Sequence, residues 1–470
     1  MSGKNLKEPS RHIFAVVSIA MGILVVLSAI PWSRLTGNKV KDFNLFEDLI
    51  PSSRNPAAPS QADIDPELES FLAEEEPDEH EEMPSEPQVT EIEETPVIDP
   101  APAFDTEEAP RGDDGEVLLE CYGDSPLAHF KAALEGGSAR VAVLGDSFIE
   151  GDIFTQDLRS LLQDTYGGNG IGYAAMHTDF PGFRSSVHQS DAGWKMHDLR
   201  NLATHDTLRT ISGEYGRAEL AASATYKAGE RRHADSWERS RFLFISPDSG
   251  TVTLTTTAGP SSYPISPSDD VQILEAAGST RLFKVETDIN GLIGLGVYLD
   301  GTSGIQVDCM SIRGNSGIGH RKMNLPLAAQ MRRHIDYDLI ILEYGINALS
   351  GEQTDYTPYG AAMKRTVGRI RACYPEADII IMGIADRGAK DGSTVHSLPT
   401  CAAMVRTQRD VARSSGCVFW DTREAMGGDD AVIDWRKRKL MNADYIHINH
   451  DGGKELARLF HQSLIKAINE

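Results

Sequence analysis

The sequence has few cysteines and no long Lys/Arg-rich stripe or basic patch interleaved with aromatic residues, and both shortages limit what the protein can be. Its five cysteines are scattered through 470 residues without a C-x-x-C pair: Cys121, Cys309, Cys373, Cys401 and Cys417. This spacing predicts neither a zinc site nor a disulfide framework. Because no basic stripe is present, nucleic acid is not an expected partner.

Positive charge is nearly missing from one segment, and this segment sets the acidity of the whole chain. The net charge is −25, and residues 61–116 account for −21 of it, with 22 Asp and Glu against a single basic residue, Arg111. Eleven of the 23 prolines lie in residues 51–110. A segment of this composition cannot bury enough apolar surface to offset its ordering entropy. Residues 33–116 are therefore predicted to form a disordered linker.

Long apolar runs are scarce too, and the longest is residues 13–30, which are predominantly apolar and carry no charge over 18 residues. That length is sufficient for a transmembrane helix. We therefore expect a membrane anchor at 13–32, a cytoplasmic tail at 1–12, and the rest of the chain in the periplasm or outside the cell. The alternative is a cleaved signal peptide, whose apolar region is usually shorter, about 7–15 residues.

Two separated regions, 117–184 and 311–470, have the pattern of one α/β domain. Strands that are apolar throughout alternate with amphipathic helices, which indicates a parallel sheet covered on both faces. The predicted strands are 140–145, 338–345, 378–385 and 417–421, and the predicted helices are 155–166, 361–371, 399–413 and 453–468.

The region between them, residues 185–310, is rich in Gly, Ser and Thr and alternates apolar with polar residues, as in "GTVTLTTTAG" and "RLFKVETD". This pattern is typical of antiparallel strands joined by turns. We expect a β-sandwich-like module inserted into the α/β domain after its first strand and helix. Two unrelated consecutive domains are the alternative, but strand 140–145 would then lack partners.

Ser147 stands where the first predicted strand ends, in "RVAVLGDSFIEGD". A serine hydroxyl becomes a good nucleophile only when a base removes its proton and a third group orients that base. The spacing of Asp444 and His447, just before the last predicted helix, lets one turn carry both groups. His447, His450 and Asp451 are an alternative set of metal ligands, but no further ligand cluster supports them, so no metal is expected.

Two glycine-containing turns supply candidates for an oxyanion hole, which needs donors aimed at the developing negative charge. "RGNSGIG" places Gly317 after the β module, and "EYGINA" places the amide of Asn347 at the end of a predicted strand. Either stretch alone is better explained as an ordinary turn after a strand.

The order of these motifs carries more information than any one of them. G-D-S after a strand, then S-G, then G-x-N after a strand, then D-x-x-H before the last helix resembles the SGNH/GDSL hydrolase family over residues 117–180 and 311–470. The resemblance implies a flavodoxin-like, three-layer α/β domain that needs no cofactor. Ala348 departs from the family pattern, in which Asp often follows this Asn. The resemblance also implies a nucleophile, Ser147, triad partners Asp444 and His447, and oxyanion donors from the Ser147 N–H, Gly317 and Asn347.

An SGNH domain interrupted by a carbohydrate-binding-like β module is similar to bacterial peptidoglycan O-acetylesterases. The similarity implies a membrane-anchored, extracytoplasmic serine esterase whose substrate is an acetylated glycan, with peptidoglycan as the first expectation. Asp146, Arg387 and Trp194 are the residues expected to line the substrate cleft. An O-acetyltransferase with the same triad and a non-catalytic glycan-binding tether are the alternative functions.

Overall fold

The computed structural model describes residues 109–202, 206–391 and 394–470. The predicted membrane anchor and most of the predicted linker lie outside these residues. Within them, no helix is both long and apolar enough to cross a membrane. The last part of the predicted linker packs on the α/β domain, because Arg111 pairs with Glu424 at 2.6 Å and Glu116 pairs with Lys466 at 2.8 Å. Residues 109–116 therefore belong to the folded domain.

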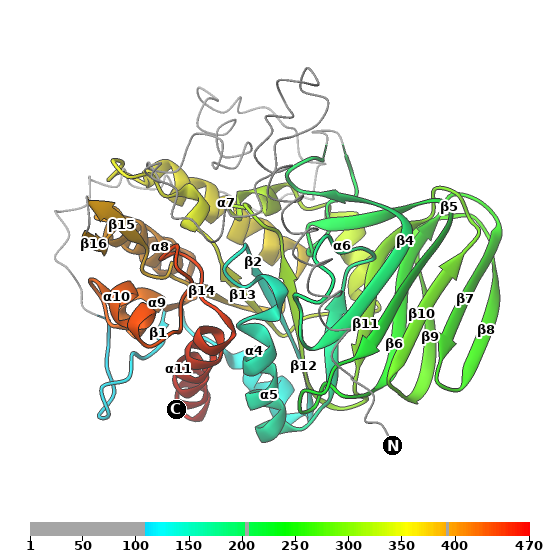
Figure 1. Cartoon of the computed structure of the whole chain (residues 1–470), viewed down its shortest axis with the longest axis horizontal. Coiled ribbons are helices and arrows are strands. Elements are labelled where there is room, and N and C mark those ends of the chain that lie inside the picture. Colours follow the sequence, from blue (N-terminus) through cyan, green and yellow to red (C-terminus); the bar gives the residue numbers. More distant parts are fainter. Residues whose placement is uncertain (1–108, 203–205, 392–393) are drawn as a thin grey trace, which may run out of the picture. The chain divides into compact units, whose positions relative to one another are not determined.

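Six strands form the mostly parallel sheet of the α/β domain, in the order β1-β17-β14-β13-β2-β12 (Figure 1). All neighbours pair in parallel except β1, which pairs antiparallel with β17. Numbered along the chain, the five parallel strands lie in the flavodoxin-like order 2-1-3-4-5 that the motifs implied. In sheet order the bounds are Glu120–Cys121, Val418–Trp420, Asp378–Met382, Leu339–Glu343, Ser138–Gly145 and Gly304–Ser311.

Helices cover both faces of this sheet (Figure 1). Strand β13 shows why its sequence is apolar throughout: Leu339 and Ile341 enter one core, and Ile340 and Leu342 enter the other. The first core contains side chains of α4 (Ala128–Glu135), α5 (Thr155–Tyr166), α9 (Thr422–Met426), α10 (Ala431–Lys437) and α11 (His450–Asn469). The second contains side chains of α6 (Leu325–Arg332), α7 (Thr357–Cys373) and α8 (Cys401–Ser415).

An antiparallel sheet of nine strands forms the inserted module, with a core of its own. Its main path is β8-β7-β10-β5-β11-β6-β9, while β3 pairs with β11 and β4 pairs with β5. From β3 to β11 the bounds are Gly170–Ala174, Val187–Asp198, Glu214–Ala228, Trp237–Ser246, Gly250–Thr256, Gly259–Ile265, Ser268–Thr280, Leu282–Thr287 and Ile293–Asp300. A separate antiparallel pair, β15 (Gly388–Asp391) with β16 (Thr394–Ser397), was not predicted.

The module starts and ends earlier than the predicted range of 185–310. Strand β3 at residues 170–174 belongs to the module, although the predicted boundary placed these residues in the α/β domain. Strand β12 at residues 304–311 pairs in parallel with β2 and belongs to the α/β domain. Its alternating sequence indicated an antiparallel strand with one solvent-exposed face, but the polar residues Gln306 and Asp308 are only 5% and 0% exposed. The polar side of β12 faces a buried charge network, not water.

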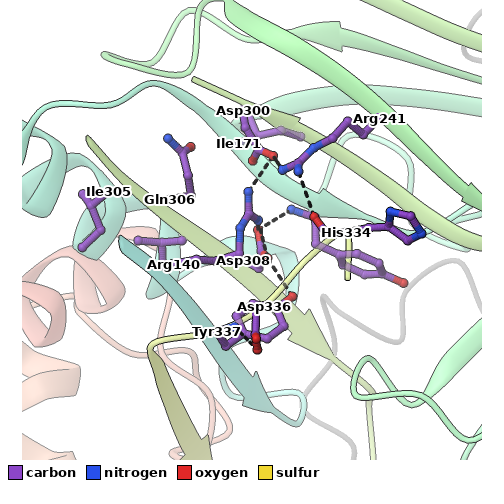
Figure 2. Close-up of polar contacts among 12 residues, drawn as sticks. Arg140, Ile171, Arg241, Asp300, Ile305, Gln306, Asp308, His334, Asp336 and Tyr337 are labelled. Atoms are coloured by element: carbon purple, nitrogen blue, oxygen red, sulfur yellow. Dashed lines mark hydrogen bonds and ion pairs between the residues drawn. The ribbon is translucent and has the colours of Figure 1, made fainter. Parts of the chain in front are cut away.

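This network joins the two sheets (Figure 2). Arg140 of β2 donates to Asp308 of β12 at 2.7 Å and to Asp300 of β11 at 2.6 Å. Arg241 of β6 also donates to Asp300, and the Tyr337 hydroxyl donates to Asp308 at 2.8 Å. Both aspartate side chains are fully buried, and those of Arg140 and Arg241 are 9% and 7% exposed. Because two cations meet two anions, the network places no net charge in the interior.

Candidate active site

Ser147 lies just beyond the carboxyl end of β2, where the strand order of the parallel sheet reverses. In open α/β sheets ligands bind at this place, because the connections on either side leave in opposite directions and open a crevice. The turn is shaped by Asp146, whose Oδ1 accepts a hydrogen bond from the N–H of Phe148 at 2.9 Å. A strand that is buried at every residue after Ser138 therefore ends in a turn that presents a partly exposed serine.

Ser147, His447 and Asp444 form a continuous chain of hydrogen bonds. Ser147 Oγ lies 3.1 Å from His447 Nε2, and His447 Nδ1 lies 2.8 Å from Asp444 Oδ2. With Nδ1 donating to Asp444, Nε2 is the acceptor for the serine proton. Burial acts to raise the pKa of Asp444, but hydrogen bonds from His447 and from the N–H of Ile446 outweigh it, and the pKa is lowered. The carboxylate therefore stays ionised and can stabilise an imidazolium.

The turn that carries the acid and the base is held in place at both of its ends. An antiparallel bridge between Met441 and Ile448 closes the loop, and α11 begins directly afterwards at His450. Gly453, in the first turn of α11, touches the segment that follows the nucleophile: a Cβ there would lie 2.2 Å from the main-chain oxygen of Ile153. Only glycine permits this approach, so Gly453 sets the distance between α11 and the segment after the nucleophile.

Two of the three predicted oxyanion donors, Asn347 and Gly317, meet around Asn315. Asn347 Nδ2 donates to Asp146 Oδ2 at 2.8 Å and to the main-chain oxygen of Asn315 at 3.1 Å, and the Gly317 N–H donates to Asn315 Oδ1 at 2.8 Å. An oxyanion must therefore replace Asn315 as their acceptor. A developing negative oxygen accepts more strongly than a neutral amide oxygen, so this exchange favours the transition state. The oxyanion role of both donors stays a prediction.

A second carboxyl group, that of Glu343, lies beside Asp146 inside the protein. Glu343 ends β13, is 1% exposed, and accepts a hydrogen bond from the backbone N–H of Asp146. Burial raises the pKa of Asp146 to about 7, and burial together with the nearby Asp146 raises the pKa of Glu343 well above its usual range. The raised pKa of Glu343 favours its protonated, neutral form. A neutral carboxyl group near Asn347 limits repulsion of an oxyanion.

Replacing Asn347 by alanine is expected to lower kcat for p-nitrophenyl acetate by about 10²–10³-fold, with KM little changed. The variant loses a donor to the oxyanion and removes the partner of Asp146 Oδ2. Asn290→Ala, a change at a module loop contact with Leu220, is the matched control and keeps the wild-type kcat. A loss of less than about threefold in Asn347→Ala would contradict the donor role.

The three residues expected to line the cleft lie in different surroundings. Trp194 is 8% exposed, because its large ring packs in the core of the β module. Trp194 therefore does not line the cleft. Asp146 is fully buried behind the nucleophile and contacts Asn347. Arg387 donates to the main-chain oxygen of Ile346 at 3.3 Å, which places it beside the turn that carries Asn347.

His450, one of the three alternative metal ligands, has its Nδ1 3.0 Å from Gln156 Nε2. Across the described residues, no group of three or more His, Cys, Asp and Glu side chains is arranged to hold a metal ion. Sequence reasoning missed Glu343 and Asn315. A glutamate inside the apolar run 338–345 was a signal for the first, whereas nothing distinguished Asn315 from any other turn residue.

Residues 295–454 match the GDSL-like lipase/acylhydrolase family. Among solved structures, a peptidoglycan O-acetylesterase is similar with a TM-score of 0.61 and 24% identity, over 75% of this chain and 99% of that chain, and this likeness shows the fold. A family two carbohydrate esterase from Cellvibrio japonicus has a TM-score of 0.26 and 13% identity, over 60% and 98%. No curated protein sequence matches. The matched residues contain the last three of the four motifs, and over this part of the chain the match confirms the resemblance to the family.

Proposed function

We propose that this SGNH/GDSL-type serine hydrolase removes O-acetyl groups from a cell-wall glycan, peptidoglycan first among them, outside the cytoplasm. The observation that carries the proposal is the hydrogen-bonded chain from Ser147 through His447 to Asp444, at the carboxyl end of the parallel sheet. Acyl transfer at neutral pH needs this combination of nucleophile, base and orienting carboxylate.

The reaction follows from the positions of these atoms. Ser147 Oγ attacks the acetyl carbonyl while its proton passes to His447 Nε2. The negative oxygen is held by the N–H groups of Ser147 and Gly317 and by the Asn347 amide. The sugar oxygen leaves with the proton from His447, and acetyl remains on Ser147. Water then gives a proton to His447 and attacks the acetyl group, which releases acetate and restores the serine.

Three observations support a glycan substrate outside the cytoplasm. A peptidoglycan O-acetylesterase shares this fold over 99% of its length. A β module with a core of its own adjoins the catalytic domain. The apolar run 13–30 and the acidic, proline-rich segment 33–108 have the composition of an anchor and of an extended spacer. An anchor and a spacer of this kind would hold the catalytic domain within reach of a glycan layer beside the membrane.

The full-length protein is expected to release acetate from O-acetylated peptidoglycan, and its Ser147→Ala variant is expected to release none. Acetate is measured with an enzyme-coupled assay. Acetate release from acetylated xylan but not from peptidoglycan would overturn the proposed substrate. Transfer of acetyl from p-nitrophenyl acetate to a sugar hydroxyl, without release of acetate, would identify a transferase instead.

A further inference from the structure

A cavity of about 360 Å³ lies between the β module and the α/β domain, close to the catalytic turn. The α/β domain contributes Glu150, Gly151 and Arg313 to its walls, and the module contributes Tyr173 and Glu214. Glu150 and Gly151 follow the nucleophile by three and four positions. The volume falls in the lower part of the range of about 300–1,000 Å³ that is usual for small-molecule sites.

Two phenylalanines form an apolar rim on this cavity. Phe180 and Phe183 are 51% and 37% exposed, and they are two of the four large apolar side chains that are exposed in the described part of the chain. The Phe183 ring lies on the catalytic side, 6.3 Å from the ring of His450 and so close to Gly151 that a Cβ there would lie 2.5 Å from its Cδ1. The Arg313 guanidinium lies 5.1 Å from the Phe180 ring centroid.

The charges along the cavity walls favour an uncharged ligand. A free cationic group would attract an anion, but every cationic side chain on these walls already faces a carboxylate. The pairs are Arg184 with Asp152, Arg200 with Asp198, Arg313 with Glu150, and His177 with Asp179 and Asp191.

Glu214 supplies a polar group of a different kind. Its Oε1 accepts a hydrogen bond from the Tyr173 hydroxyl at 3.1 Å. Burial raises the pKa of Glu214 to about 8, Asp198 acts in the same direction, and Arg200 and His177 act against it. Below about pH 8 the carboxyl group is therefore neutral and carries a proton that it can donate to a ligand oxygen.

We propose that this cavity binds one uncharged sugar residue of the glycan, next to the residue whose ester is cleaved at Ser147. Sugar rings combine an apolar face with hydroxyl and amide oxygens, which matches an aromatic rim above a protonated carboxyl group. The sugar packs on Phe180 and accepts a hydrogen bond from Glu214. This inference rests on the proposed function, and it adds a binding position for the neighbouring sugar.

The first test compares a polymeric with a small substrate. In Glu214→Ala and in Phe180→Ala, the ratio of kcat/KM for O-acetylated peptidoglycan to kcat/KM for p-nitrophenyl acetate is expected to fall about tenfold, because the small ester does not reach the cavity. Glu286→Ala on β10 is the matched control, since Glu286 pairs with Lys284 on the module surface, and it keeps the wild-type ratio. An unchanged ratio in both cavity variants would overturn the proposal.

The second test measures binding without turnover. Full-length Ser147→Ala is titrated with tetra-N-acetylchitotetraose by calorimetry at pH 7 and pH 9. Binding is expected to weaken at least about fivefold at pH 9, because Glu214 loses its proton as the pH rises through about 8. Adding Glu214→Gln, which stays neutral, is expected to remove this difference. The same weakening in the Gln variant would overturn the role of Glu214.

Tetragalacturonate, a charged oligosaccharide, is expected to bind at least about tenfold more weakly than the neutral tetramer at pH 7. Equal binding of the two would overturn the assignment of an uncharged ligand. A different result would overturn the proposed function: the wild-type protein hydrolyses p-nitrophenyl acetate but releases no acetate from any glycan. Because the calorimetric measurement needs no turnover, it would still decide whether the cavity binds a sugar.

Discussion

Replacing Ser147 by alanine is expected to lower kcat for p-nitrophenyl acetate by about 10⁴-fold or more. The variant lacks the Ser147 oxygen that attacks the carbonyl, so His447 Nε2 has no serine proton to accept. Binding of the ester and the oxyanion donors remain, so a small residual rate over water is expected. Because the lost hydroxyl group is small and partly exposed, the unfolding midpoint should stay near that of the wild type.

The control for this experiment is Ser261→Ala, an exposed serine on β8, which is expected to keep the wild-type kcat. The double variant Ser147→Ala/His447→Ala should be no slower than Ser147→Ala alone, since residues that act as one unit do not add. A fall in kcat of less than about a hundredfold in Ser147→Ala would contradict the serine mechanism.

Replacing Arg140 by methionine is expected to lower the free energy of unfolding by about 3–5 kcal/mol. Methionine fills a similar volume but leaves two buried carboxylates, Asp300 and Asp308, with Arg241 as the remaining cation (Figure 2). Removing one partner of a buried ion network leaves an uncompensated charge in a medium of low polarity. Urea-induced unfolding followed by circular dichroism measures the loss.

The matched control makes the same change in an exposed ion pair. Arg458 pairs with Glu455 on the surface of α11, with its side chain 46% exposed. Arg458→Met is expected to change the free energy of unfolding by no more than about 1 kcal/mol, because water already screens that pair. If Arg140→Met cost no more than this control, the network would not stabilise the contact between the two sheets. Restoring stability with Asp308→Asn in the Arg140→Met background would assign the loss to the unpaired charge.

The hydrogen-bonded arrangement of Ser147, His447 and Asp444 was predictable because each of its motifs is short and local in sequence. Asp444 and His447 are three positions apart in one turn, and Ser147 follows directly after an apolar strand. The carboxyl ends of parallel strands share one edge of the sheet, so short motifs that end or follow different strands meet there without knowledge of the tertiary contacts. The order of the motifs then supplied the pairing of a nucleophile with a base 300 positions away.

The boundaries of the module were not predictable for a physical reason. In β12, Gln306 and Asp308 alternate with Ile305 and Val307, which is the pattern of a strand with one face in water. Both polar residues are buried, and Asp308 pairs with Arg140 on another strand. The alternation of apolar and polar residues along a strand shows that its two faces differ. It does not show whether the polar face contacts solvent or a buried charged group. That distinction depends on contacts between distant segments.

The insertion of the module also determines the order in which the working parts of the enzyme are made. β2 is synthesised first, but its neighbours β12 and β13 start only at residues 304 and 339, and the base follows the nucleophile by 300 positions. At about 5–20 residues per second, translation takes about 15–60 s to cover that distance. Until β12 has been made, β2 has no partner in its sheet, and its apolar sides must be shielded from other chains. The unfinished polypeptide therefore lacks the contact between Ser147 and His447 until almost all of the chain is made, and it is most prone to aggregation before β12 has been added.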